Sequence, residues 1–542
     1  MQSARGLWKS RASAPRAPIF VMSLPLEGSD AASTTSGPEC REVHHLENLI
    51  FMGLEHKVIN GARWVAMGMG ARRLVGFVVF AVITRYIQPE TLGLVALAFV
   101  YIAFVEMFSK QGLGMALIQR KKLTERDLNT AFFINVGSAI LLGVVSFIFA
   151  GPIAGFLGDE RLAGVIRILS ITFPVNASTV APIALQSRAF DFKSQALQSF
   201  LGTFVAGLIA IPMAVFGWEM WALVAQAMIT SFIGSLTIWL RTSWRPSLSF
   251  DPDEAKKLTS FSVKILISNI MGFTRGRSDQ ILIGLMVGPT ALGLYILALR
   301  LVQTIDSFVK APLDRLAVSA FSAIQGDRDR LLNAICRGMR LNALFCCPVF
   351  VGLALLAPDA ITIAFSNRWA GAAGVCSILA LNSLAGSLFF FNYHVMISQG
   401  YPGVQTTFQG LQACGVIFAA FVGRKWGIEG IASVMVLMTL LIGSVETVVL
   451  GRILKIEIRP LLHSLVVPLV ASGVMAGVVL ALRQLSILNH LPAYPIAIIL
   501  AMGGAGIYIL MILVLSKSQS REAIGLLRAL LDMKKMTSIN RA

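Results

Sequence analysis

Long apolar segments recur along almost the whole chain and predict a bundle of membrane-spanning helices. From about residue 60 onward, apolar runs alternate with short polar connections. A helix needs about 20 apolar residues to cross a bilayer, and about fourteen runs have that length. They lie near 65–85, 92–110, 130–150, 164–186, 197–216, 220–240, 260–287, 290–310, 340–357, 371–397, 406–423, 428–450, 462–482 and 494–515. The predicted fold class is an all-α polytopic membrane protein.

Two sequence motifs occur twice, in the same order, and predict an internal repeat. PETLGLVALA at 89–98 matches PTALGLYILA at 289–298, and GWEMWALVAQAM at 217–228 aligns with GIEGIASVMVLM at 427–438. Spans one to six and seven to twelve therefore form two repeats. Because six helices per repeat leave both in the same orientation, we expect them to be related by an axis along the membrane normal.

The repeats set the expected domain boundaries. We predict a disordered N-terminal extension at 1–58, an N-lobe at 59–245, a C-lobe at 246–455, two additional helices at 456–516 and a cytoplasmic basic tail at 517–542. The extension is rich in Ser, Ala, Pro and Arg, which favours disorder. The tail is compatible with an interfacial helix on anionic lipid or with a solvated segment.

Composition and charge support a membrane protein and orient it. The 542 residues are 56% hydrophobic and 14% charged with a net charge of +18, whereas soluble domains carry about a quarter charged residues. Loops after even-numbered spans hold nineteen Lys and Arg and those after odd-numbered spans hold six. This asymmetry places both termini in the cytoplasm. Because the basic residues are spread over short loops, nucleic-acid binding is not expected.

Charged residues inside the spans are the candidate functional groups, because each is costly in lipid unless it is paired or faces water. The candidate substrate-binding residues are Arg72, Arg73, Arg275, Arg277, Asp279 and Arg300, and the candidate coupling residues are Glu106, Lys110, Asp306 and Glu446. Arginine exceeds carboxylate in the seventh and eighth spans, which suits an anionic substrate such as a phosphate.

Simpler structural roles remain open for some of these residues. Arg275 and Asp279, like Glu106 and Lys110, are four residues apart, so each pair could serve only to hold helices in register. His394, in a mainly apolar span, is either a proton carrier or a packed core residue.

Enzyme signatures are missing from the sequence. GMGARR at 68–73 lacks the third glycine and the strand–helix context of a dinucleotide site. Asp251 and Asp253 fit a helix N-cap before the seventh span better than a catalytic pair. The six cysteines lack metal-ligand spacing. We predict a protein that is not an enzyme, with no metal and no cofactor.

The chain resembles a family of transporters in its most specific stretch. Four stretches resemble the polysaccharide-exporter (Wzx-type) branch of the multidrug/oligosaccharidyl-lipid/polysaccharide superfamily. They are LGLVALAFVYIAFVEMFSKQGLGMALIQRKKLTERDLNTAFFIN at 92–135, WALVAQ at 221–226, SDQILIG…LGLY at 278–295 and FSAIQGDRDRL at 321–331. The similarity extends over about 60–480 and is greatest to exporters of the colanic-acid and exopolysaccharide kind.

This resemblance implies a flippase for undecaprenyl-pyrophosphate-linked oligosaccharide repeat units of exopolysaccharide or O-antigen, located in the inner membrane. It implies two six-helix bundles around a cationic cavity, with two added helices as in the lipid II flippase, working by alternating access. The implied partners are the lipid-linked oligosaccharide, membrane lipid and polysaccharide polymerase or export proteins. Family members usually have Asn-x-Asp near Ser278 and Asp279, whereas Arg-Gly-Arg precedes these residues here.

Three alternative functions are weighed against this one. A drug/cation antiporter of the same superfamily would have about twelve spans and acidic residues in its N-lobe, where Glu106 is the one candidate. A lipid II flippase would share the fold, but residues 92–135 favour polysaccharide export. A polymerase or ligase would need a large periplasmic loop, and none of the odd-numbered loops is long.

Overall fold

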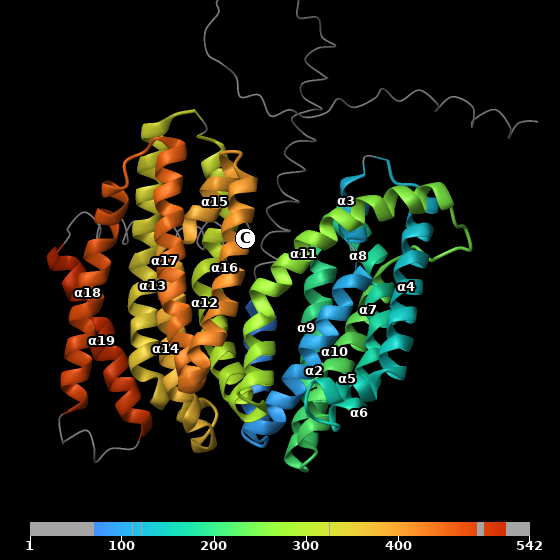
Figure 1. The fold of residues 1–542 in the computed structure, drawn as a ribbon, viewed down its shortest axis with the longest axis horizontal. Helices are drawn as coiled ribbons and strands as arrows, with labels where there is room; N and C mark the ends of the chain where they lie inside the picture. The colour runs from blue at the N-terminus through green and yellow to red at the C-terminus, as the bar shows by residue number, and fades with distance from the viewer. Residues whose placement is uncertain (1–69, 111, 121, 325, 485–492, 516–542) are drawn as a thin grey trace, which may run out of the picture. The chain divides into compact units, whose positions relative to one another are not determined.

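The computed structural model describes residues 70–110, 112–120, 122–324, 326–484 and 493–515, which fold into helices joined by short connections (Figure 1). The described part of the first half contains helical residues 70–84 and α2 (Pro89–Lys110), α3 (Leu113–Gln119), α4 (Glu125–Ile148), α5 (Ala150–Phe156), α6 (Leu162–Ser170), α7 (Thr172–Ser178), α8 (Val180–Arg188), α9 (Phe192–Val215) and α10 (Glu219–Arg241). The predicted extension and basic tail lie outside the described residues.

The described second half continues with longer helices. It contains α11 (Pro252–Met286), α12 (Pro289–Ser322), α13 (Arg328–Ala364), η1 (Asn367–Ala372), α14 (Ala373–Leu388), α15 (Phe390–Ser398), α16 (Pro402–Gly423), η2 (Arg424–Trp426), α17 (Gly427–Leu454), α18 (Arg459–Arg483) and α19 (Ala493–Leu515). The predicted boundary between the lobes, at 245/246, falls in the connection from α10 to α11. The domain boundaries themselves stay predictions.

The helices account for the expected spans. Eleven stretches of the described residues are long and apolar enough to cross a membrane, and Pro402–Leu454 holds two helices, α16 and α17. The helix at 70–84 and the charged helix α11 are not among the eleven. When α16 and α17 are counted separately and these two helices are added, the total is the expected fourteen. The all-α polytopic fold is confirmed.

The side chains of Thr124 and Asp251 cap the N-termini of α4 and α11. The Thr124 side chain accepts a hydrogen bond from the backbone N–H of Asp127, whose carboxylate accepts one from the N–H of Thr124. Asp251 likewise caps α11 by accepting from the N–H groups of Asp253 and Glu254, as predicted. These caps satisfy backbone donors that the first turn leaves unpaired.

The second repeated motif has the same local structure in both halves. Gly217 and Gly427 have φ of 84° and 69°, a region that favours glycine. Gly217 lies two residues before the first residue of α10, and Gly427 is the first residue of α17. In the first half, the Glu219 carboxylate accepts hydrogen bonds from the N–H of Gln88 (3.1 Å) and the hydroxyl of Thr91 (3.0 Å). This carboxylate therefore joins α10 to the beginning of α2.

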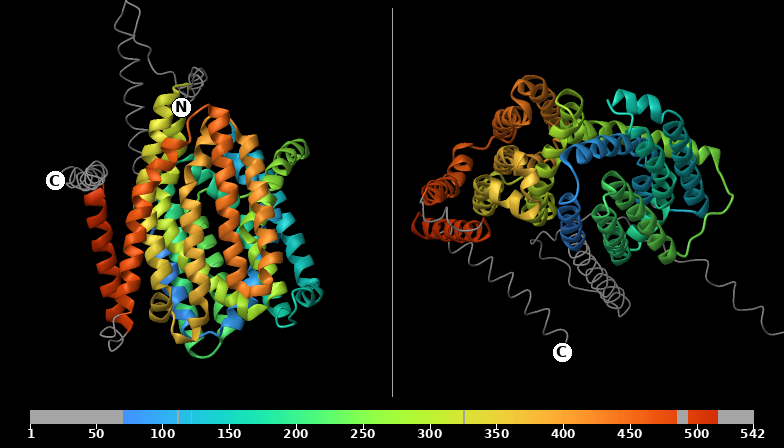
Figure 2. Two further views of the ribbon diagram at one scale, coloured as in Figure 1. Left: turned by 60° about the vertical axis from the view of Figure 1, so that its left-hand side comes forward. Right: turned by 90° about the horizontal axis from the view of Figure 1, so that it is seen from below.

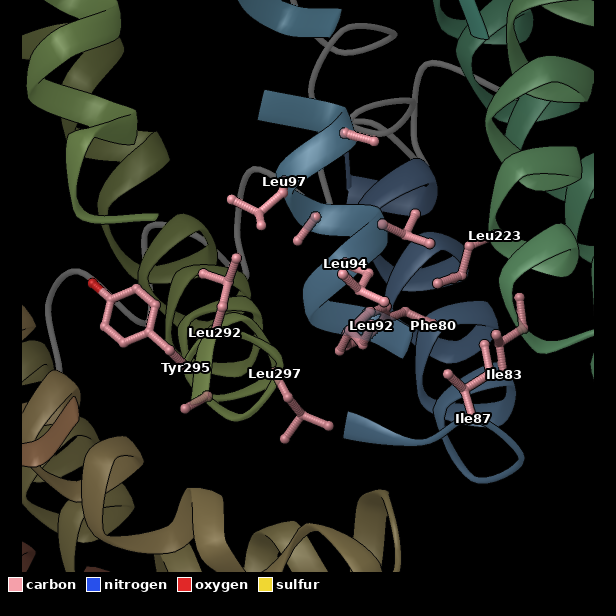
Figure 3. Packing of buried hydrophobic residues seen from close by; sticks show 14 of the residues in the cluster. Phe80, Ile83, Ile87, Leu92, Leu94, Leu97, Leu223, Leu292, Tyr295 and Leu297 are labelled. Atoms are coloured by element: carbon pink, nitrogen blue, oxygen red, sulfur yellow. The ribbon is translucent and has the colours of Figure 1, made fainter. Parts of the chain in front are cut away.

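The first repeated motif forms a symmetric contact between the halves. A Cβ atom on Gly93 would lie 1.8 Å from the carbonyl oxygen of Pro289, and a Cβ atom on Gly293 would lie 1.8 Å from the carbonyl oxygen of Pro89. Only glycine permits α2 and α12 to approach so closely at both places. Leu92, Leu94, Leu97, Leu292 and Leu297 of these helices belong to one buried cluster (Figure 3).

Further bonds hold the two halves together near this crossing. The guanidinium of Arg85, just after the helix at 70–84, donates to the carbonyl oxygens of Ile363 (2.6 Å) and Ala364 (3.2 Å). The buried Trp369 indole N–H donates to the Thr84 carbonyl at 2.8 Å. These bonds satisfy carbonyl groups at helix ends.

Helices α18 and α19 follow the two repeats and pack beside α13 (Figure 2). Leu344 of α13 belongs to a small buried cluster with residues of α18 and α19, including Met475 and Tyr508. The Tyr508 hydroxyl donates to the Leu344 carbonyl at 2.9 Å. The two added helices therefore attach to the second repeat, within the described residues.

An ion cluster links the beginning of α11 to the first half. Arg120 pairs with Asp127 at 2.5 Å and with Glu254, while Lys257 pairs with Glu254 at 2.9 Å. The hydrogen bond from Arg120 lowers the pKa of Glu254 below its usual value, and Lys257 adds to this effect. The same bond raises the pKa of Arg120. The first turn of α11 is thus held by charge, outside the apolar spans.

Replacing Gly93 or Gly293 by alanine should destabilise the protein. Each added methyl group would meet backbone atoms, which cannot move as a flexible side chain does, and such overpacking typically costs about 1–3 kcal/mol. We expect a lower thermal unfolding midpoint in detergent for both variants. Gly137→Ala is the matched control, because nothing lies within 4 Å of a Cβ atom at this helical glycine. Equal midpoints for Gly93→Ala and the control would contradict the contact.

Glu254→Gln should lower thermal stability at pH 7 and have no effect in acid. Because the folded pKa of Glu254 is depressed, its contribution is complete above the ordinary carboxyl pKa of about 4.3 and disappears as the pH falls through the lowered value. Unfolding midpoints of wild type and variant, measured from pH 7 down to about 3, should converge at the acid end. The exposed Glu125, as Glu125→Gln, is the control; a pH-independent difference would contradict the assignment.

Candidate functional site

Helix α11 presents its two candidate arginines to different surroundings. Arg275 and Arg277 are two residues apart, which rotates their side chains by about 200° around the helix axis. Arg275 lines a cavity inside the second repeat. Arg277 donates to the Gln280 side chain at 3.0 Å and its charge acts on Arg300 of α12. The predicted substrate-binding residues therefore divide into two groups.

Three of the predicted arginines form one positively charged group. The charges of Arg72 and Arg277 both act on Arg300, so one arginine from helix 70–84 and one from α11 lie within electrostatic range of Arg300 on α12. All three side chains are exposed. The Arg300 guanidinium also lies over the ring of Phe80, 5.6 Å from its centroid, a cation–π contact. None of the described carboxylates forms an ion pair with the three. We call Arg72, Arg277 and Arg300 the arginine cluster.

Arginine clusters of this kind suit phosphates. A guanidinium presents planar N–H groups that can bind two phosphate oxygens at once. Because repulsion among three neighbouring cations is relieved by an anion, the cluster favours a ligand that carries negative charge.

Asp279 has a structural partner rather than the predicted one. It is buried, and its carboxylate accepts a hydrogen bond of 2.6 Å from the buried hydroxyl of Tyr295 on α12. No ion pair joins it to Arg275 in the described structure, although the two are four residues apart. Asp279 thus fixes α11 against α12 beside the arginine cluster.

The remaining predicted residues lie at separate places. The Arg73 guanidinium donates to the Ser307 carbonyl at 3.2 Å, which ties helix 70–84 to α12. Glu106 accepts a 2.5 Å hydrogen bond from Asn176, and Asp306 pairs with Lys310 at 2.6 Å within α12. The side chain of Lys110 lies outside the described part. Glu106 and Glu446 are in different halves, and their coupling roles stay predictions.

A polar cavity of about 530 Å³ lies among helices of the second repeat. Its walls come from α11, α12, α14, α15, α16 and α17 and include Arg275, Lys310, Asp314, Asn382, Ser383, Phe389, Phe390, Tyr393, His394, Gln405, Gln409, Gln412, Thr439 and Glu446. We call it the amide cavity, after its row of glutamines.

The charged groups of the amide cavity are largely paired. His394 is buried, and its Nε2 lies 2.8 Å from an Asp314 carboxylate oxygen while its Nδ1 lies 3.0 Å from the Phe390 carbonyl oxygen. Lys310 is held by Asp306. His394 is therefore more than an apolar packing residue, because both ring nitrogens have polar partners beside an accessible cavity.

Sequence reasoning missed most of this cavity. Glutamine, asparagine and threonine carry no charge, so a search for charges inside spans passes over them. One signal was available: Gln405, Gln409 and Gln412 are spaced four and three apart, which places them on one face of a helix. Such a polar stripe in an otherwise apolar span indicates a wet interior surface.

A second cavity is apolar. It measures about 790 Å³ and lies between α13, α18 and α19, with Leu344, Leu356, Met475, Leu500 and Ile512 among its lining residues. Its chemistry suits a hydrocarbon chain.

Comparison with known proteins decides the family. The family described as "Polysaccharide biosynthesis protein" matches residues 82–374, more than half of the chain. The chain belongs to this family. The family resemblance, found at residues 92–135 and in the shorter matching stretches, is thereby confirmed.

Two proteins with similar sequences agree with this family membership. The succinoglycan biosynthesis transport protein ExoT of Rhizobium meliloti (strain 1021) is 25% identical over 464 residues, 84% of this chain and 92% of ExoT. The teichuronic acid biosynthesis protein TuaB of Bacillus subtilis (strain 168) is 26% identical over 352 residues, 64% of this chain and 72% of TuaB.

Two solved transporters share the fold. The lipid II flippase MurJ in an inward closed conformation has a TM-score of 0.69 at 13% identity, covering 85% of this chain and 99% of MurJ. An inward-facing multidrug resistance transporter of the MATE family, in the MOP superfamily, has a TM-score of 0.53 at 15% identity. The match covers 71% of this chain and 95% of that transporter. This family member is a multi-pass membrane protein with the fold of that superfamily.

Tyr295→Phe should reduce stability by leaving the Asp279 carboxylate without its donor. An unsatisfied buried acceptor typically costs about 1–3 kcal/mol. The expected result is a lower unfolding midpoint for Tyr295→Phe than for Tyr86→Phe, an exposed tyrosine. In a double-mutant cycle with Asp279→Leu, the two changes should cost less together than the sum of the single changes. Additive effects would show that the bond does not stabilise the fold.

Proposed function

We propose that this protein carries undecaprenyl-pyrophosphate-linked oligosaccharide repeat units across the inner membrane for exopolysaccharide or O-antigen synthesis. The observation that carries the proposal is the arginine cluster, three exposed cations on three membrane helices, within a polysaccharide biosynthesis family. A pyrophosphate provides the anionic oxygens that such a cluster binds. The role is transport without a chemical step.

The other parts of the substrate have suitable surfaces. The apolar cavity of α13, α18 and α19 fits a polyprenyl chain, which stays in lipid while the head group crosses. Relatives named for succinoglycan transport and teichuronic acid biosynthesis favour a polysaccharide precursor as cargo. Both polysaccharides are made from sugars, so a sugar head group follows from the same comparison.

Alternating access is the mechanism that the repeat favours. Two halves that touch through matching motifs at α2 and α12 can rock about that contact, exposing the arginine cluster to one side at a time. The excess of Lys and Arg in the loops after even-numbered spans supports a cytoplasmic location for the Arg120–Glu254 cluster and both termini. The α2–α12 crossing then lies toward the outer side.

Deleting the gene should remove surface polysaccharide and cause lipid-linked single repeat units to accumulate on the cytoplasmic leaflet. The intact gene and Arg126→Ala, at an exposed arginine of α4, should restore export. Arg277→Ala and Arg300→Ala should not, because each lost charge-assisted bond costs about tenfold or more in binding. Immunoblots of membranes confirm insertion, and labelled lipid-linked oligosaccharide reports the pool.

Four other outcomes would overturn this proposal. Normal surface polymer from both arginine variants would remove the cluster from the mechanism. Normal polymer in the deletion strain with new drug sensitivity would indicate an antiporter. Repeat units that are flipped but not polymerised would indicate a membrane enzyme, and a loss of peptidoglycan precursor transport would indicate a lipid II flippase.

A further inference from the structure

The amide cavity contains two buried acceptor atoms that have no hydrogen-bond partner among the described residues. They are Oε1 of Gln405 and Oε1 of Glu446, and both residues are 3% exposed. Leaving such an atom unsatisfied is costly. Because both residues line the cavity, a rotation of either side chain would present its acceptor atom to a ligand that donates hydrogen bonds. The side-chain amides of Gln405 and Asn392 face the Glu446 carboxylate, which keeps this group in position.

The other groups around the cavity can both donate and accept. Gln405, Gln409 and Gln412 present a row of amides from one face of α16, and Asn382 and Thr439 add an amide and a hydroxyl from α14 and α17. The Thr439 hydroxyl already donates to the Asn382 oxygen at 2.8 Å. Each amide carries two N–H donors and a carbonyl acceptor. This inventory matches a ligand with many hydroxyl groups.

The cavity has room for a ligand much larger than a single ion. About 530 Å³ is within the 300–1,000 Å³ of typical ligand sites, whereas one water occupies about 30 Å³. Aromatic rings of Phe389, Phe390 and Tyr393 line one part of the wall. Flat apolar rings beside planar polar groups fit the alternating C–H faces and hydroxyl edges of a sugar ring.

We propose that the amide cavity is a glycan subsite, which binds a hydroxyl-rich sugar of the head group through Gln405, Glu446 and the row of amides. This inference rests on the proposed function, because it names the site for the sugar while the arginine cluster takes the pyrophosphate. Arg275 borders the cavity and Arg277 belongs to the arginine cluster. They differ by about 3 Å along α11, so the two subsites flank the same part of this helix.

The test separates the two subsites with two probes. The full-length protein in lipid nanodiscs is titrated calorimetrically with the repeat-unit oligosaccharide, cut from the organism's own surface polysaccharide by partial hydrolysis, and separately with undecaprenyl pyrophosphate that carries no sugar. Gln405→Leu and Gln409→Leu should each weaken oligosaccharide binding about threefold to tenfold, the loss expected for one neutral hydrogen bond. Neither should change undecaprenyl pyrophosphate binding.

Matched variants complete the design. Thr407→Leu, exposed on α16 and away from the cavity, should bind both probes as wild type does. Glu446→Gln keeps an acceptor and should retain more oligosaccharide binding than Glu446→Leu. Arg300→Ala should weaken binding of undecaprenyl pyrophosphate and leave oligosaccharide binding intact.

The outcomes distinguish failure of this inference from failure of the proposed function. Oligosaccharide binding that is absent in wild type, or unchanged in Gln405→Leu and Gln409→Leu, overturns the glycan subsite. Variants that alter only the dependence of transport on protons or sodium also overturn it, in favour of an ion site. Normal surface polymer in the deletion strain refutes the transport function itself, whatever the binding data show.

Discussion

Helices α2 and α12 cross so closely that the first carbonyl oxygen of each occupies the space that a side chain would need on the other. Pro89 faces Gly293 and Pro289 faces Gly93 at the same separation. Proline begins each helix with a fixed backbone angle, and glycine four residues later removes the only side chain in the way. This crossing positions α12, which supplies Arg300 to the arginine cluster and Lys310 and Asp314 to the wall of the amide cavity.

Near this contact, unpaired charged side chains are exposed, whereas a buried charged side chain has a hydrogen-bond donor. Charges that lack an ion-pair partner among the described residues, such as those of Arg72, Arg277 and Arg300, stay accessible. Asp279 is buried and has Tyr295 as its donor. The separation is physically sensible, because an exposed guanidinium can exchange water for a ligand, whereas a buried carboxylate without a donor would destabilise the bundle.

Much of the fold could be predicted from the sequence because its signals are local. Apolar runs of about 20 residues predicted the spans. Asp251 predicted the N-terminus of α11, and the paired motifs predicted the repeat. The site was less accessible. Helix geometry alone could have separated Arg275 from Arg277, but the meeting of Asp279 with Tyr295, and of Arg300 with Arg72, depends on how helices pack. The amide cavity was missed because its walls are neutral side chains from six helices.

The reciprocal contact of the two proline–glycine motifs also constrains how the two halves can diverge. After a duplication, equivalent segments normally accumulate changes independently. Here a larger residue at position 93 collides with backbone of the other half, which no side-chain substitution at position 289 can remove. The two motifs are therefore expected to drift far more slowly than the cavity walls. Selection for a different cargo can then reshape the glutamine row of α16 while the crossing of α2 and α12 stays as it is.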